Sequence, residues 1–357
     1  MEEGGGEVVN FIKVWTTVVI SLCYCYGIRN KGIKKLIFVF PVVCLFLYLP
    51  LNLSSPHLGG TTAFFIAWLA NFKLLLFAFG KGPLSLDPSI SLPLFVAVAC
   101  LPIKVSPNST LNHTSSTSTS TKIKDGFLSY ALKGFIVAIL VNIYKYSDFI
   151  HPKIIFALYA FHIYFLLEIN LAISAALART LLGIELEPQF NHPYLATSLQ
   201  DFWGKRWNLM VTGILRPTVY DPIRNVFKRL CGRDCATLVA VFATFVASAI
   251  MHELMFYYLG RVTPTWEITA FFLLHGFCVT AEIVIKKAFK GKLQLPGILS
   301  GMFTVVFVFA TANWLFFPKF AEYQIDVRAF EDYAAIGAFM RQASERVLNL
   351  CPGHPHL

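Results

Sequence analysis

The sequence predicts an all-α, polytopic membrane protein, a helical bundle of about eight crossings with one re-entrant segment. Its composition carries this prediction. Of 357 residues, 56% are hydrophobic and only 14% are charged, roughly half the charged fraction of an average soluble protein. The mean hydropathy is +0.62, and 34 Phe with 14 Tyr are more than a water-facing surface accommodates. We expect one membrane-embedded domain over residues 1–357, and we exclude soluble enzymes, disordered chains, coiled coils and disulfide scaffolds.

Eight apolar runs reach the length of about 20 residues that is needed to cross roughly 30 Å of hydrocarbon. They are Val8–Ile28, Ile33–Leu53, Gly60–Phe79, Phe127–Tyr146, Ile154–Leu182, Cys235–Leu259, Trp266–Ile285 and Gly297–Phe317. A ninth run, Leu92–Ile103, is only about a dozen residues long and contains Pro93 and Pro102. A run of that length re-enters the membrane more often than it crosses it.

Basic residues predict which loops face the cytoplasm, because cytoplasmic loops are rich in Lys and Arg. The first loop and the segment 202–233 are both strongly basic. Both are cytoplasmic only if Leu92–Ile103 does not cross, which leaves the N-terminus lumenal. A Ser/Thr-rich loop of about 104–125 is then a flexible cytoplasmic loop, and its sequons at Asn108 and Asn112 are silent. The net charge of +10 fits this topology and an anionic lipid surface, and no pattern indicates nucleic-acid binding.

Polar and ionisable side chains inside apolar spans are costly, so each is a candidate for function. They are Lys13, Lys73, His162, Glu168, Arg179, His252, Glu253, His275 and Glu282. We expect Asn71 to satisfy Lys73 locally, and His162 and His275 to bond neighbouring helices. Glu282 follows His275 by seven residues on the same helix face, which indicates a structural pair.

His252 stands apart from these candidates because small residues precede it at positions 247–249 of a strongly apolar span. Small residues let another helix or a substrate approach closely. A neutral histidine in a dry site accepts a proton from a hydroxyl, because histidine titrates near neutral pH. On these residues alone, a catalytic and a structural role for His252 are equally favoured.

The segment before this span interleaves aromatic residues with charges. We expect Trp203 and Trp207 to lie at headgroup depth, while Lys205 and Arg206 face water. Asn208 follows as the sequence turns apolar, which carries its amide into the membrane protein. An interfacial helix without chemistry is the alternative reading of this segment.

Together the two features predict acyl transfer. An alcohol is a weak nucleophile that needs a base, and a thioester carbonyl needs a donor for its developing oxyanion; His252 and Asn208 supply one of each. No G-x-S-x-G elbow offers a serine nucleophile. Cys231 and Cys235 have neither a second cysteine pair nor a nearby histidine, so a zinc site is not expected. Direct attack by the bound alcohol is therefore the simpler mechanism, with no metal and no cofactor besides acyl-CoA as a co-substrate.

These residues also carry a family resemblance. FWGKRWN (Phe202–Asn208), followed 44 residues later by the histidine of SAIMHEL (Ser248–Leu254), resembles the membrane-bound O-acyltransferase superfamily. The block Pro50–Ser85 is similar to the N-terminal signature of its plant wax synthase branch. The resemblance implies that His252 and Asn208 are the catalytic pair of an enzyme of the endoplasmic reticulum membrane. It also implies transfer of an acyl group from acyl-CoA to a lipid hydroxyl, with a long-chain alcohol giving a wax ester.

The motifs leave the acceptor open. Relatives of this branch acylate sterols or transfer acetyl groups to diacylglycerol with the same chemistry. We expect Trp203, Lys205, Arg206 and Trp207 to bind substrate, the two cations by attracting the phosphates of CoA, in a catalytic region of about 198–285. A helical C-terminal tail of about 321–357 has no predicted role, and the oligomeric state is not predicted. A lipid transporter or scramblase is the competing class, although no internal repeat indicates one.

Overall fold

The computed structural model describes residues 2–28, 31–85, 90–102, 119–182, 190–289 and 296–350, and these residues contain helices and no strand. The α-helices are α1 (Glu2–Gly27), α2 (Ile33–Tyr48), α3 (Pro56–Thr62), α4 (Asn71–Ala78), α5 (Leu92–Cys100), α6 (Thr119–Tyr144), α7 (Pro152–Leu182), α8 (Leu199–Asp201), α9 (Leu209–Leu215), α10 (Asp221–Gly260), α11 (Glu267–Ala288), α12 (Gly297–Thr311), α13 (Pro318–Glu322) and α14 (Ile325–Leu350). Wider π-helical turns form η2 (Ala63–Ala70), η6 (Phe202–Arg206), η7 (Arg216–Tyr220) and η8 (Ala312–Phe316). Tighter 3₁₀ turns form η1 (Leu49–Asn52), η3 (Pro83–Ser85), η4 (Ser147–Phe149) and η5 (Pro193–Leu195).

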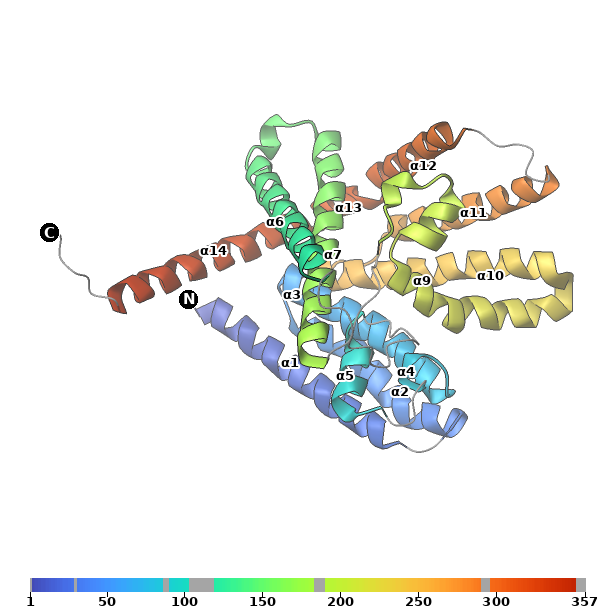
Figure 1. Cartoon of the computed structure of the whole chain (residues 1–357), viewed down its shortest axis with the longest axis horizontal. Coiled ribbons are helices and arrows are strands. Elements are labelled where there is room, and N and C mark those ends of the chain that lie inside the picture. The colour runs from blue at the N-terminus through green and yellow to red at the C-terminus, as the bar shows by residue number, and fades with distance from the viewer. Residues whose placement is uncertain are drawn as a thin grey trace.

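Two groups of helices run along the long axis of the molecule, and a helical hairpin crosses them (Figure 1). The first group comprises α1 to α5, and the second contains α10, α11 and α12. The hairpin is α6 with α7, and α14 extends away from the bundle toward the C-terminus. Residues 103–118 lie outside the described ones, so the two sequons and most of the predicted flexible loop carry no structural outcome; α6 begins at Thr119.

Seven helical segments in the described residues are long and apolar enough to cross a membrane. They cover seven of the eight predicted spans, and the eighth is the shorter apolar helix Ser129–Tyr144 within α6. The ninth run forms α5, which has nine residues and therefore rises only about 14 Å, too little to cross roughly 30 Å of hydrocarbon. The predicted polytopic helical fold is confirmed, and the short run is too short to cross, as expected, while its re-entry stays a prediction.

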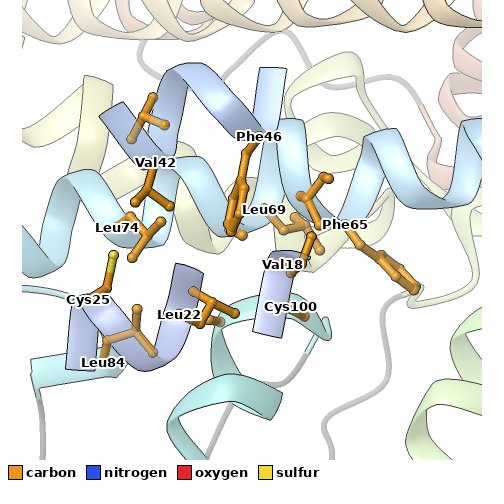
Figure 2. Packing of buried hydrophobic residues seen from close by; sticks show 14 of the residues in the cluster. Val18, Leu22, Cys25, Val42, Phe46, Phe65, Leu69, Leu74, Leu84 and Cys100 are labelled. Atoms are coloured by element: carbon orange, nitrogen blue, oxygen red, sulfur yellow. The ribbon is translucent and has the colours of Figure 1, made fainter. Parts of the chain in front are cut away.

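The first helical group packs around its own apolar core (Figure 2). Val18, Leu22, Phe46 and Leu69 are fully buried between α1, α2 and η2. Cys100 at the end of α5 is also buried there, where the thiol packs as a small apolar group. This core fixes the position of α3 and η2, which form one wall of the site described below.

Lys73 belongs to this core and has a structural role. Its side chain is 1% exposed, and Nζ donates hydrogen bonds to the carbonyl oxygens of Val98 (2.6 Å) and Leu101 (2.7 Å). These are unpaired carbonyls at the C-terminal end of α5, where a cation is favourable. The prediction that Asn71 satisfies Lys73 was wrong: the Asn71 amide donates to Val43 and Ala67 instead. Lys73 thus holds the short helix α5 against the bundle.

The helical arm that carries His252 begins close to the predicted Cys235, but the segment before it is also helical. Residues before Cys235 were assigned to a cytoplasmic loop, but α10 is helical from Asp221, with Pro222 in its first turn, where proline is tolerated. The chain turns back at Gly232, whose φ of 80° is accessible mainly to glycine. The long helix is therefore a hairpin of two helical arms, and its second arm carries His252.

Candidate active site

A cavity of about 700 Å³ lies between the two helical groups. Side chains from α3, η2, α7, η6, α10, α11, α12, η8 and α14 line it, and most of them are aliphatic or aromatic. His252 and Asn208, which are 44 residues apart in the sequence, both line this cavity. Three of the four π-helical turns, η2, η6 and η8, contribute to its wall, and such turns are frequent at functional sites.

His252 is held in one tautomer by its own helix. Nδ1 lies 2.7 Å from the carbonyl oxygen of Ser248, one turn earlier in α10, and 3.4 Å from the Ser248 hydroxyl. A carbonyl oxygen only accepts hydrogen bonds, so Nδ1 carries the proton. The other ring nitrogen, Nε2, has no hydrogen-bond partner among the described residues. The imidazole therefore offers a free lone pair on a residue that lines the cavity.

Aromatic rings fix the plane of the His252 imidazole. Phe272 from α11 stacks on it with ring centroids 4.1 Å apart. Trp68 from η2 meets it edge-on at 4.9 Å, and Phe316 from η8 lies at 6.3 Å. Stacked and edge-on rings of this kind favour defined relative orientations. The His252 imidazole is thus oriented in a largely apolar wall.

Asn208 occupies a backbone position that frees its amide. Its φ of 39° and ψ of 68° are left-handed, a conformation that asparagine tolerates better than most residues. Its Oδ1 accepts a hydrogen bond from the backbone N–H of Val211 at 3.3 Å and so caps the N-terminus of α9. The Nδ2 amide has no partner in the described part of the chain, so its two N–H groups remain free to donate.

Trp203 forms part of the cavity wall and is held by a buried histidine. Its indole Nε1–H donates to His275 Nδ1 at 3.1 Å, so the proton of His275 is on Nε2, 2.9 Å from the Thr311 hydroxyl. The Trp203 carbonyl oxygen accepts a hydrogen bond from Thr212 of α9, which begins next to Asn208. This network joins α11 and α12 to the segment that carries Asn208. The prediction that His275 bonds neighbouring elements is confirmed, whereas Glu282 pairs with Lys286 and not with His275.

The other predicted substrate-binding residues divide into two kinds. Trp207 lines the cavity and stacks on Phe202 at 5.5 Å. Arg206 is committed elsewhere: its Nε lies 2.6 Å from Asp201, and Nη1 donates to the backbone carbonyls of Asn191 and His192. Lys205 is exposed, and neither cation lines the cavity.

The Arg206–Asp201 pair organises the loop before Asn208. Burial raises the pKa of Asp201, but hydrogen bonds from Arg206 and from the Thr197 backbone outweigh it and hold that pKa below its usual range. Asp201 is therefore ionised and keeps Arg206 in place near neutral pH. Of the two cations predicted to attract CoA, only Lys205 has its charge free of an ion pair among the described residues.

The remaining candidates are either bound to structural partners or exposed. Glu253, next to His252, accepts a hydrogen bond from the Thr269 backbone at 2.9 Å and so caps the first turn of α11. Glu168 accepts from Tyr164 and pairs with Lys133. Lys13 and Arg179 are exposed. None of these four side chains belongs to the wall that surrounds His252.

A second polar group of residues lines the same cavity, and of its members the sequence indicated only His162. We call it the far-end cluster: His57, Tyr159, His162, Asp326 and Tyr333. His57 Nδ1 donates to Asp332 at 2.8 Å, and the Tyr333 hydroxyl lies 2.9 Å from His162 Nε2. Tyr159 donates to Asp326 at 2.7 Å. The acidic and tyrosine partners come from α14, the predicted tail without a role.

The sequence has close relatives among characterised families of membrane enzymes. Residues 186–274 match the membrane bound O-acyl transferase family. An acyl-CoA–sterol O-acyltransferase 1 from Arabidopsis thaliana is 53% identical over 92% of this chain and 96% of its own length. A long-chain-alcohol O-fatty-acyltransferase from Simmondsia chinensis is 44% identical over 92% of this chain and 94% of its own. A probable long-chain-alcohol O-fatty-acyltransferase 3 from Arabidopsis thaliana is 44% identical over 89% of this chain.

The chain belongs to the membrane-bound O-acyltransferase family. Both Asn208 and His252 fall within the matched residues, as do Trp203 and Trp207. His57 and Asp332 fall outside them. The far-end cluster is therefore built from parts of this acyltransferase that the family match does not include.

Proposed function

We propose that this acyltransferase moves an acyl group from acyl-CoA to the hydroxyl of an apolar lipid. The observation that carries the proposal is the placement of a histidine with a free Nε2 and an asparagine with a free amide in one cavity of about 700 Å³. A cavity of this size with an apolar wall and few polar groups suits a lipid. The family and its acyltransferase relatives support the same reaction.

The reaction proceeds by direct attack. His252 Nε2 accepts the hydroxyl proton as the alcohol oxygen bonds to the thioester carbonyl carbon. The Asn208 amide donates to the oxyanion that develops on that carbonyl. The carbon–sulfur bond then breaks, and the proton passes from His252 to the departing CoA sulfur. The products are an ester and free CoA, and His252 returns to its neutral tautomer.

The acceptor of the main proposal is a long-chain fatty alcohol, giving a wax ester. A sterol is the second candidate, and one observation favours it: the sterol O-acyltransferase is 53% identical to this chain, against 44% for the long-chain-alcohol enzyme from Simmondsia chinensis. Diacylglycerol with an acetyl donor is the third candidate from the sequence. We place the enzyme in the endoplasmic reticulum membrane, with acyl-CoA arriving from the cytoplasm and the acceptor from the bilayer.

An acceptor panel tests the proposal. Microsomes from cells without their own neutral-lipid acyltransferases receive the chain and labelled palmitoyl-CoA or acetyl-CoA, with hexadecanol, a sterol or diacylglycerol. Wax ester supports the main proposal, and sterol ester moves the enzyme to the second acceptor. Acetylated diacylglycerol moves it to the third. An absence of ester with every acceptor contradicts the proposed function and favours a transporter.

A further inference from the structure

One wall of the cavity connects its reactive end to the far-end cluster. His57, Thr61, Phe64 and Trp68 lie on one face of the continuous helix α3–η2 and all line the cavity. The Trp68 ring contacts the His252 ring at 4.9 Å. His57 is eleven residues before Trp68, which corresponds to at most about 16 Å along the wall, because the wider turns of η2 rise less than the about 1.5 Å per residue of an α-helix.

The far end of this wall is polar, whereas the wall between the two ends is mainly aromatic. The ring of Tyr333 lies 4.5 Å from that of His57, and the Tyr333 hydroxyl bonds His162. The two histidines of the cluster therefore lie at the same end of the cavity. An apolar cavity with a few convergent polar groups is typical of a site that recognises a polar atom on an apolar ligand.

His57 resembles His252 in the state of its ring. Its Nδ1–H donates to Asp332, whose Oδ2 also accepts from the Ser55 hydroxyl at 2.7 Å and from the His57 backbone at 3.1 Å. Burial raises the pKa of Asp332, but these bonds outweigh it and keep the carboxylate ionised near neutral pH. Nε2 of His57 has no partner among the described residues. The cluster thus offers an oriented acceptor nitrogen, beside the Tyr333 hydroxyl, at the end of a lipid-sized cavity.

We propose that His57, with His162 and Tyr333, binds a second hydroxyl at the far end of the lipid whose other end reacts at His252. This inference rests on the proposed function and names a substrate class for it. An extended chain advances about 1.2 Å per bond, so a chain of up to about 13 bonds reaches along this stretch of wall. The α,ω-diol of dodecane has this separation between its two oxygen atoms. The same terminal hydroxyl could be carried by the acceptor or by the acyl chain of the donor.

A purely structural role for the cluster is the competing explanation, because its partners hold α14 on the bundle. Arg328 of α14 does this as well, by donating to the backbone carbonyls of Leu259 and Ser54. Arg328 is absent from the cavity wall. Arg328→Met is therefore the matched control for a loosened α14 that leaves the far-end cluster in place.

The experiment compares kcat/KM of the purified full chain for dodecanol, its α,ω-diol and the isomeric diol with its second hydroxyl at mid-chain, with palmitoyl-CoA as donor. We expect kcat/KM for the α,ω-diol, after correction for its two equivalent hydroxyls, to be about tenfold higher than for the other two acceptors. This factor corresponds to the contribution of one net hydrogen bond. In His57→Phe this ratio should fall to about one, while Arg328→Met should keep it. If kcat/KM of the wild-type chain is equal for the three acceptors, the proposal that the acceptor carries the second hydroxyl is overturned, and no variant is needed for that conclusion.

A donor arm separates the two sources of the hydroxyl. Dodecanoyl-CoA and its ω-hydroxy derivative are compared with dodecanol as acceptor, and a preference confined to this arm assigns the site to the acyl chain. No preference in either arm, with ester still formed, overturns the far-end site and leaves the proposed function standing. If Arg328→Met loses the preference in kcat/KM for the α,ω-diol as completely as His57→Phe does, the far-end site is also overturned. The cluster then has the structural role. No ester from any pair contradicts the proposed fatty-alcohol acceptor, on which this inference rests.

Discussion

His252 and His57 line the same cavity, and they differ in what orients them. His252 donates its Nδ1–H to Ser248, four residues earlier in the same helix, whereas His57 donates to Asp332, which is 275 residues away in the sequence. Nε2 is free on both in the described part of the chain. A backbone carbonyl within one helix fixes a tautomer without any tertiary contact, but a carboxylate from α14 requires the finished fold. The comparison separates a reactive end that is largely set within one helix from a far end that depends on packing.

The largest expected effect on activity comes from removing the proposed base, His252. His252→Ala should lower kcat by about 10²–10⁴, the usual contribution of a general base, with expression unchanged. His57→Ala should lower it much less. His151→Ala, an exposed histidine at the start of α7, is the control for the loss of a histidine side chain. Ester formation in microsomes measures all three, and substantial residual activity in His252→Ala contradicts its assignment.

Asn208 tests whether the reactive end also needs an oxyanion donor. Asn208→Ala should cost roughly 10²–10³ in rate. Because the position has a left-handed backbone, Asn208→Gly is the informative partner: glycine keeps that conformation and, like alanine, removes both the amide donor and the cap on α9. Equal losses in kcat for both variants would assign the effect to the amide. Recovery of activity in Asn208→Gly would show that the alanine variant acted through the backbone.

Support for the reactive end comes from the buried pair Trp203–His275. His275→Leu leaves the Trp203 N–H without its partner, while the Thr311 hydroxyl still donates to Phe307, and it should destabilise the protein by about 1–3 kcal/mol. A shift of the cavity wall should also lower kcat roughly tenfold to a hundredfold. Trp203→Phe removes the same hydrogen bond, so the double variant should lose less than the sum of the two single losses. Additive losses in kcat would show that His275 does not act through Trp203.

The smallest expected effect concerns the carboxylate that orients His57. The pKa of Asp332 is lowered in the folded protein, so its stabilising contribution is present above the unfolded value of about 3.9 and is lost as the pH falls below it. Asp332→Asn should therefore lower the unfolding temperature between pH 5 and 8, and the difference from the wild type should close below about pH 4. A difference in unfolding temperature that stays unchanged below pH 4 would contradict the assignment of the effect to this carboxylate.

Much of the reactive end was predictable from the sequence because its determinants are local. His252 stood out through its small neighbours and its apolar span, and Asn208 through the turn from charged to apolar residues. The apolar runs gave the spans, because length and hydropathy decide whether a helix crosses a membrane. Lys73 was assigned to the wrong partner, since α5 folds back beside it only in the tertiary structure.

The far end was not predictable in the same way. No spacing rule links His57 to Asp332. The segment that forms α14 was predicted to be a tail without a role because its sequence is amphipathic and too polar to span a membrane. Arg206 was predicted to face CoA, yet it is held by Asp201 and two carbonyls, partners that only the folded loop brings together. Whether the acceptor hydroxyl attacks acyl-CoA directly at His252 is the question that an experiment should decide first.

Thiol release from acyl-CoA tests direct attack most immediately. The purified chain is mixed with palmitoyl-CoA, and free CoA is followed before and after addition of the preferred acceptor, while labelled acyl chain on the protein is measured in parallel. Direct attack predicts no thiol release and no acylated protein until the acceptor is present, and then equal amounts of thiol and ester. A burst of thiol equal to the amount of protein, with the acyl group bound covalently to the chain, would contradict it.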